Sequence, residues 1–349
     1  MSIKRLVFGQ HDQKDVYNYE VELDNVKATF GECGAAIIKY EVKDKNGLYR
    51  DVVLGFDNLE GYLNNKPGFG AVVGRVANRI GKAAYVRNNV KYMLTANENS
   101  NTLHSGYGYQ YRVWSSMAYE DEEGAHIIFS IESPDGDQGF PGNLALDVEY
   151  FVSKDSSLTI NYTYSSDKET PVALTNHCYF NLNGCTSGSA LEHKLQINSN
   201  YVTQVDNELI PTGKNLNVNN SAFDFRNMKV IKDNMVYSFE PYTYDKHFDI
   251  NYVVAEDKGK VKKICTLESS ESGIGMNVYT DLPGVQFYCG YFLKEIGKNN
   301  YKHTSFDGLC FETQYFPDSV NNPQFPSPFI NALEKVTTTT KYEFYVNKD

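Results

Sequence analysis

The chain has 349 residues, of which 41% are hydrophobic and 14% aromatic, with 27 tyrosines and a single tryptophan. This composition supports a large core and favours strands over helices. A net charge of −11, from 33 basic and 44 acidic residues, makes nucleic acids and anionic membranes poor partners. The length allows one or two domains.

Short strands separated by turns are predicted from the N-terminus to about residue 54, with room for one helical turn at residues 57–62. In residues 83–94, two apolar and aromatic segments flank Asn88-Asn89. This pattern predicts a hairpin, because Asn tolerates the left-handed backbone region. No segment keeps a helical period over the roughly ten to twelve residues that a helix prediction needs. The sequence therefore predicts a sheet-dominated fold.

Residues 144–152 and 158–164 predict an antiparallel pair of strands with one wet face, because apolar and polar residues alternate in both. The apolar face consists of Leu146, Val148, Tyr150, Val152, Leu158, Ile160, Tyr162 and Tyr164. Later strands are predicted at residues 191–197, 261–267, 275–279, 285–288, 309–315 and 341–346. Because strand follows strand without intervening helices, a large antiparallel sandwich is expected.

The six cysteines form no C-x-x-C pair, and the seven histidines show no zinc-like spacing. Residues 1–15 contain only a short apolar run, and no later stretch approaches the length of a membrane span. We therefore predict free thiols without disulfides, no metal site and a cytoplasmic protein.

The stretch LTNHCYFNLNG, residues 174–184, is typical of a buried strand that ends in a turn. With a period of two, His177 shares a polar face with Thr175, Tyr179 and Asn181, and the opposite face is apolar. A polar face of this kind, turned towards a cleft, suits a small-molecule site. A single buried histidine is nevertheless more often a core residue whose ring is satisfied by one backbone carbonyl.

Three further stretches carry polar side chains suited to sugar hydroxyls, and each is ambiguous alone. GRVANRI, residues 74–80, contains Asn78 and Arg79, whose donors and acceptors fit a hydroxyl pair but also an ordinary surface turn. His104 in NTLHSG precedes a flexible Ser-Gly corner, from which a side chain can be aimed at a ligand. Asp245 in YDKHF either accepts hydrogen bonds from hydroxyls or caps a turn.

Glu312 lies within the apolar stretch LCFETQYFPD, residues 309–318. Such a glutamate lies either at a solvated edge or in a polar cavity. In a cavity, desolvation raises its pKa and makes it a useful base for proton transfer. For one glutamate the edge is the commoner position, because charged side chains are rarely buried without a partner.

Six stretches, in this order between about residues 74 and 321, resemble the aldose 1-epimerase (galactose mutarotase) family: GRVANRI, NTLHSG, LTNHCYFNLNG, YDKHF, DLPGVQFYCG and LCFETQYFPDSVN. The resemblance covers nearly the whole chain. It implies a single all-β domain over residues 1–349, built as one large antiparallel β-sandwich of the galactose mutarotase-like supersandwich type, with few short helices. It also implies an isomerase that interconverts the α and β anomers of a free hexose, such as galactose or glucose, without a cofactor.

The resemblance also implies roles for single residues. It makes His177 the general acid that protonates the ring oxygen, and Glu312 the base that takes the proton from the C1 hydroxyl. The sugar-binding positions of the family fall on Asn78, Arg79, His104, Asp245 and Gln286. With reference pKa values of roughly 4.3 and 6.5, the expected working pair is carboxylate plus imidazolium. Glu312 would then set the acidic limb of the pH profile and His177 the basic limb.

The chain departs from the family at Ser105-Gly106, where Gly-Gly is usual, and at Cys289-Gly290-Tyr291, where Thr-Gly-Asn is usual. Both departures bear on sugar preference rather than on the reaction. Three other functions fit parts of the pattern: a non-catalytic carbohydrate-binding sandwich, a hexose-phosphate epimerase of similar fold, and a structural or interaction protein. The expected partner is a free aldohexose, with no nucleic acid or membrane, and the expected assembly is a monomer or weak homodimer.

Overall fold

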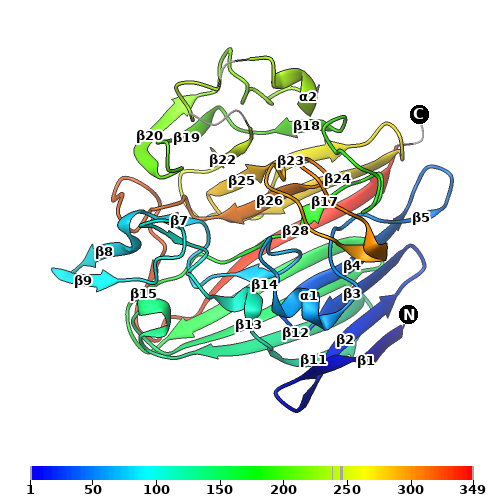
Figure 1. The fold of residues 1–349 in the computed structure, drawn as a ribbon, viewed down its shortest axis with the longest axis horizontal. Coiled ribbons are helices and arrows are strands. Elements are labelled where there is room, and N and C mark those ends of the chain that lie inside the picture. The colour runs from blue at the N-terminus through cyan, green and yellow to red at the C-terminus, as the bar shows by residue number, and fades with distance from the viewer. Residues whose placement is uncertain (1, 238, 244–246, 348–349) are drawn as a thin grey trace.

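The computed structural model describes residues 2–237, 239–243 and 247–347. Strands dominate this part of the chain, and its α-helices are the short α1 (Leu59–Leu63) and α2 (Ile231–Asn234). Three sheets of five, six and nine strands make up most of the structure (Figure 1). All their ladders are antiparallel, so the predicted all-β, antiparallel architecture is confirmed.

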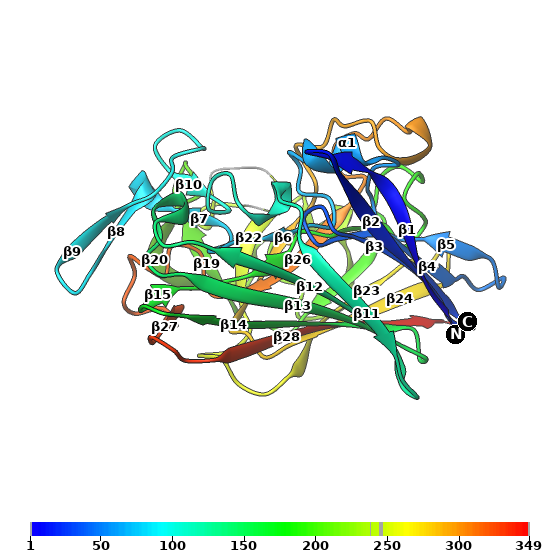
Figure 2. The same cartoon turned by 90° about the horizontal axis from the view of Figure 1, so that it is seen from below.

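The nine-stranded sheet forms the broad layer that is seen nearly edge-on in Figure 2. In spatial order it contains β11 (Ser115–Glu120), β12 (Gly124–Ser133), β13 (Leu144–Ser153), β14 (Ser157–Ser166), β28 (Val336–Val346), β24 (Ile274–Thr280), β23 (Lys262–Glu268), β18 (Lys194–Ile197) and β21 (Lys229–Val230). The predicted pair at residues 144–164 is β13 and β14, with Leu146 opposite Tyr164 and Val148 opposite Tyr162.

The other two large sheets complete the sandwich. The five-stranded sheet contains β1 (Ser2–His11), β2 (Lys14–Glu22), β3 (Val26–Gly31), β4 (Ala36–Lys43) and β5 (Tyr49–Asp51). The six-stranded sheet contains, in spatial order, β17 (Tyr179–Phe180), β26 (Leu309–Gln314), β25 (Gly284–Tyr288), β22 (Asp249–Val253), β19 (Tyr201–Val205) and β20 (Pro211–Asn217).

Short two-stranded pairs accompany the three large sheets: β7 (Arg79–Ile80) with β10 (Thr102–Leu103), β6 (Val72–Val73) with β16 (Thr175–Asn176), β15 (Thr170–Pro171) with β27 (Phe329–Ile330), and β8 (Ala84–Arg87) with β9 (Val90–Met93). The last pair is the predicted hairpin, and it projects from the body of the molecule (Figure 1). Its turn residues Asn88 and Asn89 have φ angles of 50° and 61°, in the left-handed region that this turn requires.

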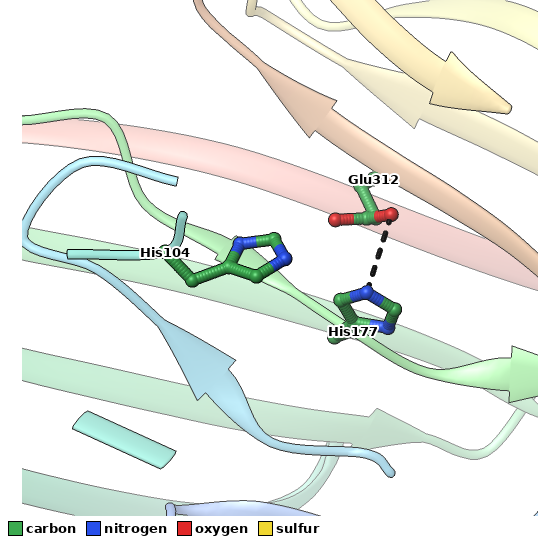
Figure 3. A group of neighbouring side chains, drawn as sticks. All are labelled: His104, His177 and Glu312. Atoms are coloured by element: carbon green, nitrogen blue, oxygen red, sulfur yellow. Dashed lines mark ion pairs between the residues drawn. The ribbon is translucent and has the colours of Figure 1, made fainter. Parts of the chain in front are cut away.

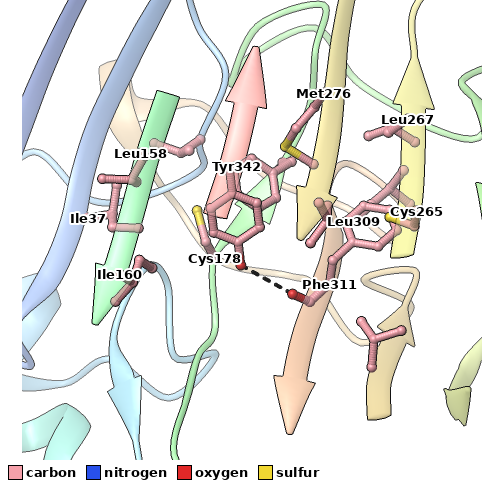
Figure 4. Close-up of a cluster of buried hydrophobic side chains, with 14 of the residues drawn as sticks. Ile37, Leu158, Ile160, Cys178, Cys265, Leu267, Met276, Leu309, Phe311 and Tyr342 are labelled. Carbon is pink, nitrogen blue, oxygen red and sulfur yellow. Dashed lines mark hydrogen bonds between the residues drawn. The ribbon is translucent and has the colours of Figure 1, made fainter. Parts of the chain in front are cut away.

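The main hydrophobic core lies between the sheets. Figure 4 shows part of it, with Ile37 from β4, Leu158 from β14 and Phe311 from β26 packed around Tyr342 of β28. The Tyr342 hydroxyl donates a hydrogen bond of 3.2 Å to the carbonyl oxygen of Phe311, which satisfies a polar group inside the core. One continuous cluster thus draws on all three sheets. The single domain over residues 1–349 stays a prediction.

All six cysteines are buried free thiols. Among the described residues, no helix has the length and apolar character needed to cross a membrane.

The stretch around His177 differs from the single strand predicted for residues 174–184. Strand β16 pairs with β6, whereas β17 pairs with β26 in another sheet, so the chain changes partners at His177. The His177 amide donates to the carbonyl of Ala71 at 2.8 Å, and the Gly70 amide donates to the carbonyl of His177 at 3.1 Å. The prediction of one strand was wrong, because an alternating pattern cannot show which neighbour each half will pair with.

Candidate active site

A cavity of about 220 Å³ opens beside the six-stranded sheet. It is smaller than the roughly 300–1,000 Å³ of pockets for drug-sized ligands, so it suits one small molecule such as a single sugar ring. Its lining combines apolar and aromatic side chains with a group of polar and charged ones, namely Asn78, Arg79, His104, His177, Asp249 and Glu312. All of these except Asp249 were predicted from the sequence, and the fold brings these five residues together.

Glu312 comes from β26, where it lies directly opposite Gln286 of β25. Leu309 and Phe311, on the other side of the strand, pack in the core. Glu312 is only 2% exposed, so of the two positions open to it the structure selects the polar cavity. Its Oε2 atom has no hydrogen-bond partner among the described residues and is therefore free to accept from a ligand. Burial, reinforced by the nearby charge of Asp249, raises the pKa of Glu312 well above its usual value.

His177 points towards Glu312, and both line the cavity (Figure 3). Its Nε2 atom lies 3.6 Å from Glu312 Oε1, and its ring stacks on Tyr179 with centroids 5.0 Å apart. Burial lowers the pKa of His177 to about 4. In free side chains the pKa of histidine lies above that of glutamate. Here the order is reversed, because burial disfavours both charged forms, the imidazolium of His177 and the carboxylate of Glu312.

His104 reaches the same cavity from the loop after β10, and its ring meets that of His177 edge to face at 5.3 Å. The backbone amide of Asn78 donates to His104 Nδ1 at 3.1 Å. Burial, and then the neighbouring His177 and Arg79, lower the pKa of His104 well below its usual value. A neutral ring that accepts at Nδ1 carries its proton on Nε2, so His104 presents a donor to the cavity.

His104, His177 and Glu312 also form a group that could hold a metal ion, with ligand atoms within 4.8 Å of one another. A metal-binding histidine normally donates its second ring N–H to a protein acceptor while the first nitrogen binds the ion. His104 does the opposite, because Nδ1 accepts from an amide and Nε2 must keep its proton. The trio is therefore poorly suited to a metal and well suited to sugar hydroxyls.

Chelators are accordingly expected to leave the anomer interconversion implied by the family resemblance unaffected. The measurement is the initial rate of anomer interconversion before and after prolonged incubation with EDTA, with the removed buffer checked for displaced metal. A loss of rate that zinc or magnesium restores would contradict this expectation and would assign the trio to a metal after all.

Arg79 is held between two carboxylates. Its Nε and Nη2 atoms donate to Glu98 at 2.7 and 2.9 Å, and Nη1 lies 3.5 Å from Asp249 Oδ2. Gln286 does not line the cavity; its Nε2 donates to Asp249 Oδ1 at 2.6 Å and so fixes that carboxylate from behind. The charge of Arg79 is thus largely compensated by the protein, and its guanidinium is fixed in orientation.

Two residues of this arrangement, Asp249 and Glu98, were not singled out in the sequence. Asp245, predicted to bind the sugar, lies outside the described residues, and Asp249 occupies the cavity. The sequence feature that drew attention to Glu312 was an acidic residue within an apolar stretch. Asp249 has the same feature, since it lies between the apolar Phe248 and Ile250. Glu98 gave no signal, since a glutamate in a polar loop is ordinary.

Comparisons with known proteins support the family resemblance found in the sequence. Residues 17–343 match the sequence profile of the aldose 1-epimerase family. The chain belongs to this family. It is 38% identical to galactose mutarotase of Mus musculus, over 99% of both chains. It is 33% identical to aldose 1-epimerase of Escherichia coli K12, over 90% of this chain and 91% of the bacterial one.

Two solved structures of similar proteins share the fold. The galactose 1-epimerase of Lactobacillus acidophilus superimposes with a TM-score of 0.86 and 25% identity, over 99% of both chains. An aldose epimerase homologue from C. elegans gives 0.85 and 29% identity, over 94% of this chain and 98% of that one. The galactose mutarotase-like sandwich predicted from the sequence is therefore confirmed.

Proposed function

We propose that this aldose 1-epimerase family member interconverts the α and β anomers of free hexoses such as galactose and glucose. The observation that carries the proposal is the buried pair of His177 and Glu312, with Nε2 and Oε1 3.6 Å apart at one wall of a sugar-sized cavity. Ring opening of a hemiacetal needs a base that takes the proton from the C1 hydroxyl and an acid that delivers one to the ring oxygen.

The proposed reaction is a paired proton transfer. Glu312 takes the proton from the C1 hydroxyl as C1–O1 becomes a carbonyl, the bond between C1 and the ring oxygen breaks, and His177 protonates that oxygen. The open aldehyde rotates about C1–C2. In the reverse steps His177 removes the proton from the C5 hydroxyl, which attacks the other face of C1, and Glu312 returns its proton to O1. No atom is gained or lost, and both residues return to their starting states.

The remaining groups of the cavity are proposed to hold the sugar hydroxyls. His104 Nε2–H and the Arg79 guanidinium donate, Asp249 accepts, and the Asn78 amide can do either. Gln286 contributes through Asp249 rather than by contact with the cavity. These binding roles are supported by donor and acceptor chemistry, and the acid and base roles of His177 and Glu312 by the resemblance to the family.

The rate should depend on pH as a broad bell. The reaction needs exactly one exchangeable proton on the pair, as carboxylate and imidazolium. Below the lowered pKa of His177, about 4, both residues are protonated and no base is left; above the raised pKa of Glu312 the last proton is lost. We therefore expect an acidic limb near pH 4, set by His177, and a basic limb set by the raised pKa of Glu312. A profile that is flat from pH 4 to 9, with the protein still folded, would remove the acid–base scheme.

Free hexoses are expected to be much better substrates than glucose 6-phosphate. A phosphate site gathers uncompensated cations, but Arg79 is already held by Glu98 and Asp249, and the net charge is −11. Among the described lining residues the cavity has one further cation, Lys66, whereas a phosphate site gathers two or more uncompensated ones. The test compares kcat/KM for glucose and glucose 6-phosphate above the spontaneous background. A higher value for the phosphate would favour the hexose-phosphate alternative.

The proposed function is tested by polarimetry of freshly dissolved α-galactose and α-glucose, with and without the protein. Faster approach to the equilibrium rotation supports an epimerase. Sugar binding by calorimetry without any acceleration would point to a carbohydrate-binding sandwich, and neither binding nor acceleration to a structural protein. The cytoplasmic location and the monomer or weak homodimer stay predictions.

A further inference from the structure

The imidazole of His177 is contacted at both nitrogens by side chains of a single strand. Cys310 and Glu312 lie two residues apart on β26 and so face the same way. Glu312 Oε1 lies 3.6 Å from Nε2, and Cys310 Sγ lies 3.7 Å from Nδ1. The position of Cys310 is fixed by the ladders, because it is paired with Tyr179 of β17 on one side and with Tyr288 of β25 on the other.

Burial raises the pKa of the Cys310 thiol well above its usual value, so the thiol keeps its proton at neutral pH. A thiol is a weak donor through S–H and a weak acceptor through sulfur. If Nε2 is the nitrogen that gives up and regains the proton, Nδ1 keeps its proton in the imidazolium and in the neutral ring, and the sulfur can accept from Nδ1–H in both states. A hydrogen bond from the ring to the backbone of His177 itself also favours the charged ring.

We propose that Cys310 is a positioning residue, whose thiol engages Nδ1 of His177 in both protonation states and leaves Nε2 as the nitrogen that exchanges protons with the sugar. This inference rests on the proposed epimerase function. It assigns to β26 two tasks: Glu312 supplies the base, and Cys310 fixes the ring that supplies the acid.

Other ionisable groups also face His177 and influence its protonation. They come from several elements around the ring, namely Glu312, His104, Asp249, Tyr179 and Tyr288. None of these contacts Nδ1 through an interaction seen among the described residues. A substitution at Cys310 should therefore act on Nδ1 while the surroundings of Nε2 stay in place.

The test compares Cys310→Ala, Cys310→Ser and Cys265→Ala with the wild-type protein. Cys265 is buried in the main core on β23, away from the cavity, so its replacement by alanine removes the same atom from a comparable environment. For Cys310→Ala we expect kcat for galactose to fall roughly three- to tenfold, the effect of one weak hydrogen bond, with KM within about twofold. Cys310→Ser, which keeps a donor and an acceptor, should recover most of the loss. Cys265→Ala should leave kcat unchanged.

A second readout does not depend on activity. In protein labelled with 15N-histidine, the ring nitrogen shifts of His177 report which nitrogen carries the proton. They are expected to change in Cys310→Ala and to remain in Cys265→Ala. Unchanged shifts, unchanged kcat in Cys310→Ala, or equal losses in Cys310→Ala and Cys310→Ser would overturn the inference. If the wild-type protein itself fails to accelerate anomer interconversion, the proposed function fails, and the nitrogen shifts still decide whether Cys310 fixes the ring.

Discussion

Replacement of Glu312 by glutamine is expected to lower kcat for galactose roughly 10²–10⁴-fold, the range that a positioned general base supplies. Glutamine has nearly the same shape but cannot take a proton at neutral pH. The fold should tolerate it well, because Glu312 is buried, its Oε2 lacks a partner among the described residues, and burial raises its pKa. Removal of a buried ionisable group with these features relieves a desolvation penalty. The melting temperature should therefore stay the same or rise.

The matched control is Glu343→Gln on β28. Glu343 accepts hydrogen bonds from Asn277 and Tyr279 and does not line the cavity. Its replacement should leave kcat within about twofold of the wild-type value, at some loss of stability. Polarimetric rates and thermal unfolding curves of both variants make the comparison. Near wild-type turnover in Glu312→Gln would show that the base is another group.

Replacement of His177 by asparagine is expected to lower kcat by a similar factor, roughly 10²–10⁴-fold, because the amide cannot deliver a proton to the ring oxygen. Glutamine at this position should behave in the same way. Sugar binding should weaken far less, since Arg79, His104 and Asp249 remain in the cavity. Kinetic constants and a calorimetric dissociation constant for galactose separate the two effects.

His126→Asn provides the control for loss of a histidine elsewhere in the fold. His126 lies on β12, where its ring nitrogens contact Glu149 at 2.9 Å and Asp121 at 3.1 Å, outside the cavity. Its replacement should leave kcat unchanged. If His177→Asn lost sugar binding as fully as turnover, the ring would be a binding group, and the carbohydrate-binding alternative would gain support.

The sequence by itself determined the class of fold and most of the strands. The alternation in β13 and β14 depends only on the two-residue period of a strand, and so it was readable without knowledge of any partner. The same holds for the hairpin turn at Asn88-Asn89, where the preference of Asn for the left-handed region is a local property. Resemblance to a family then identified His177 and Glu312, which no local pattern could distinguish from core and edge residues.

Only the tertiary structure decided how the site is assembled. His177 lies where the chain passes from one sheet to another, and Asp249 enters the cavity because β22 pairs with β25. The Glu98 contact with Arg79 links a polar loop to a strand, and the contact of Cys310 with His177 joins residues 133 positions apart. The reversed order of the two pKa values likewise comes from burial by distant segments. Strand pairing and burial depend on contacts between residues far apart in the chain, whereas a sequence pattern records only the preferences of near neighbours.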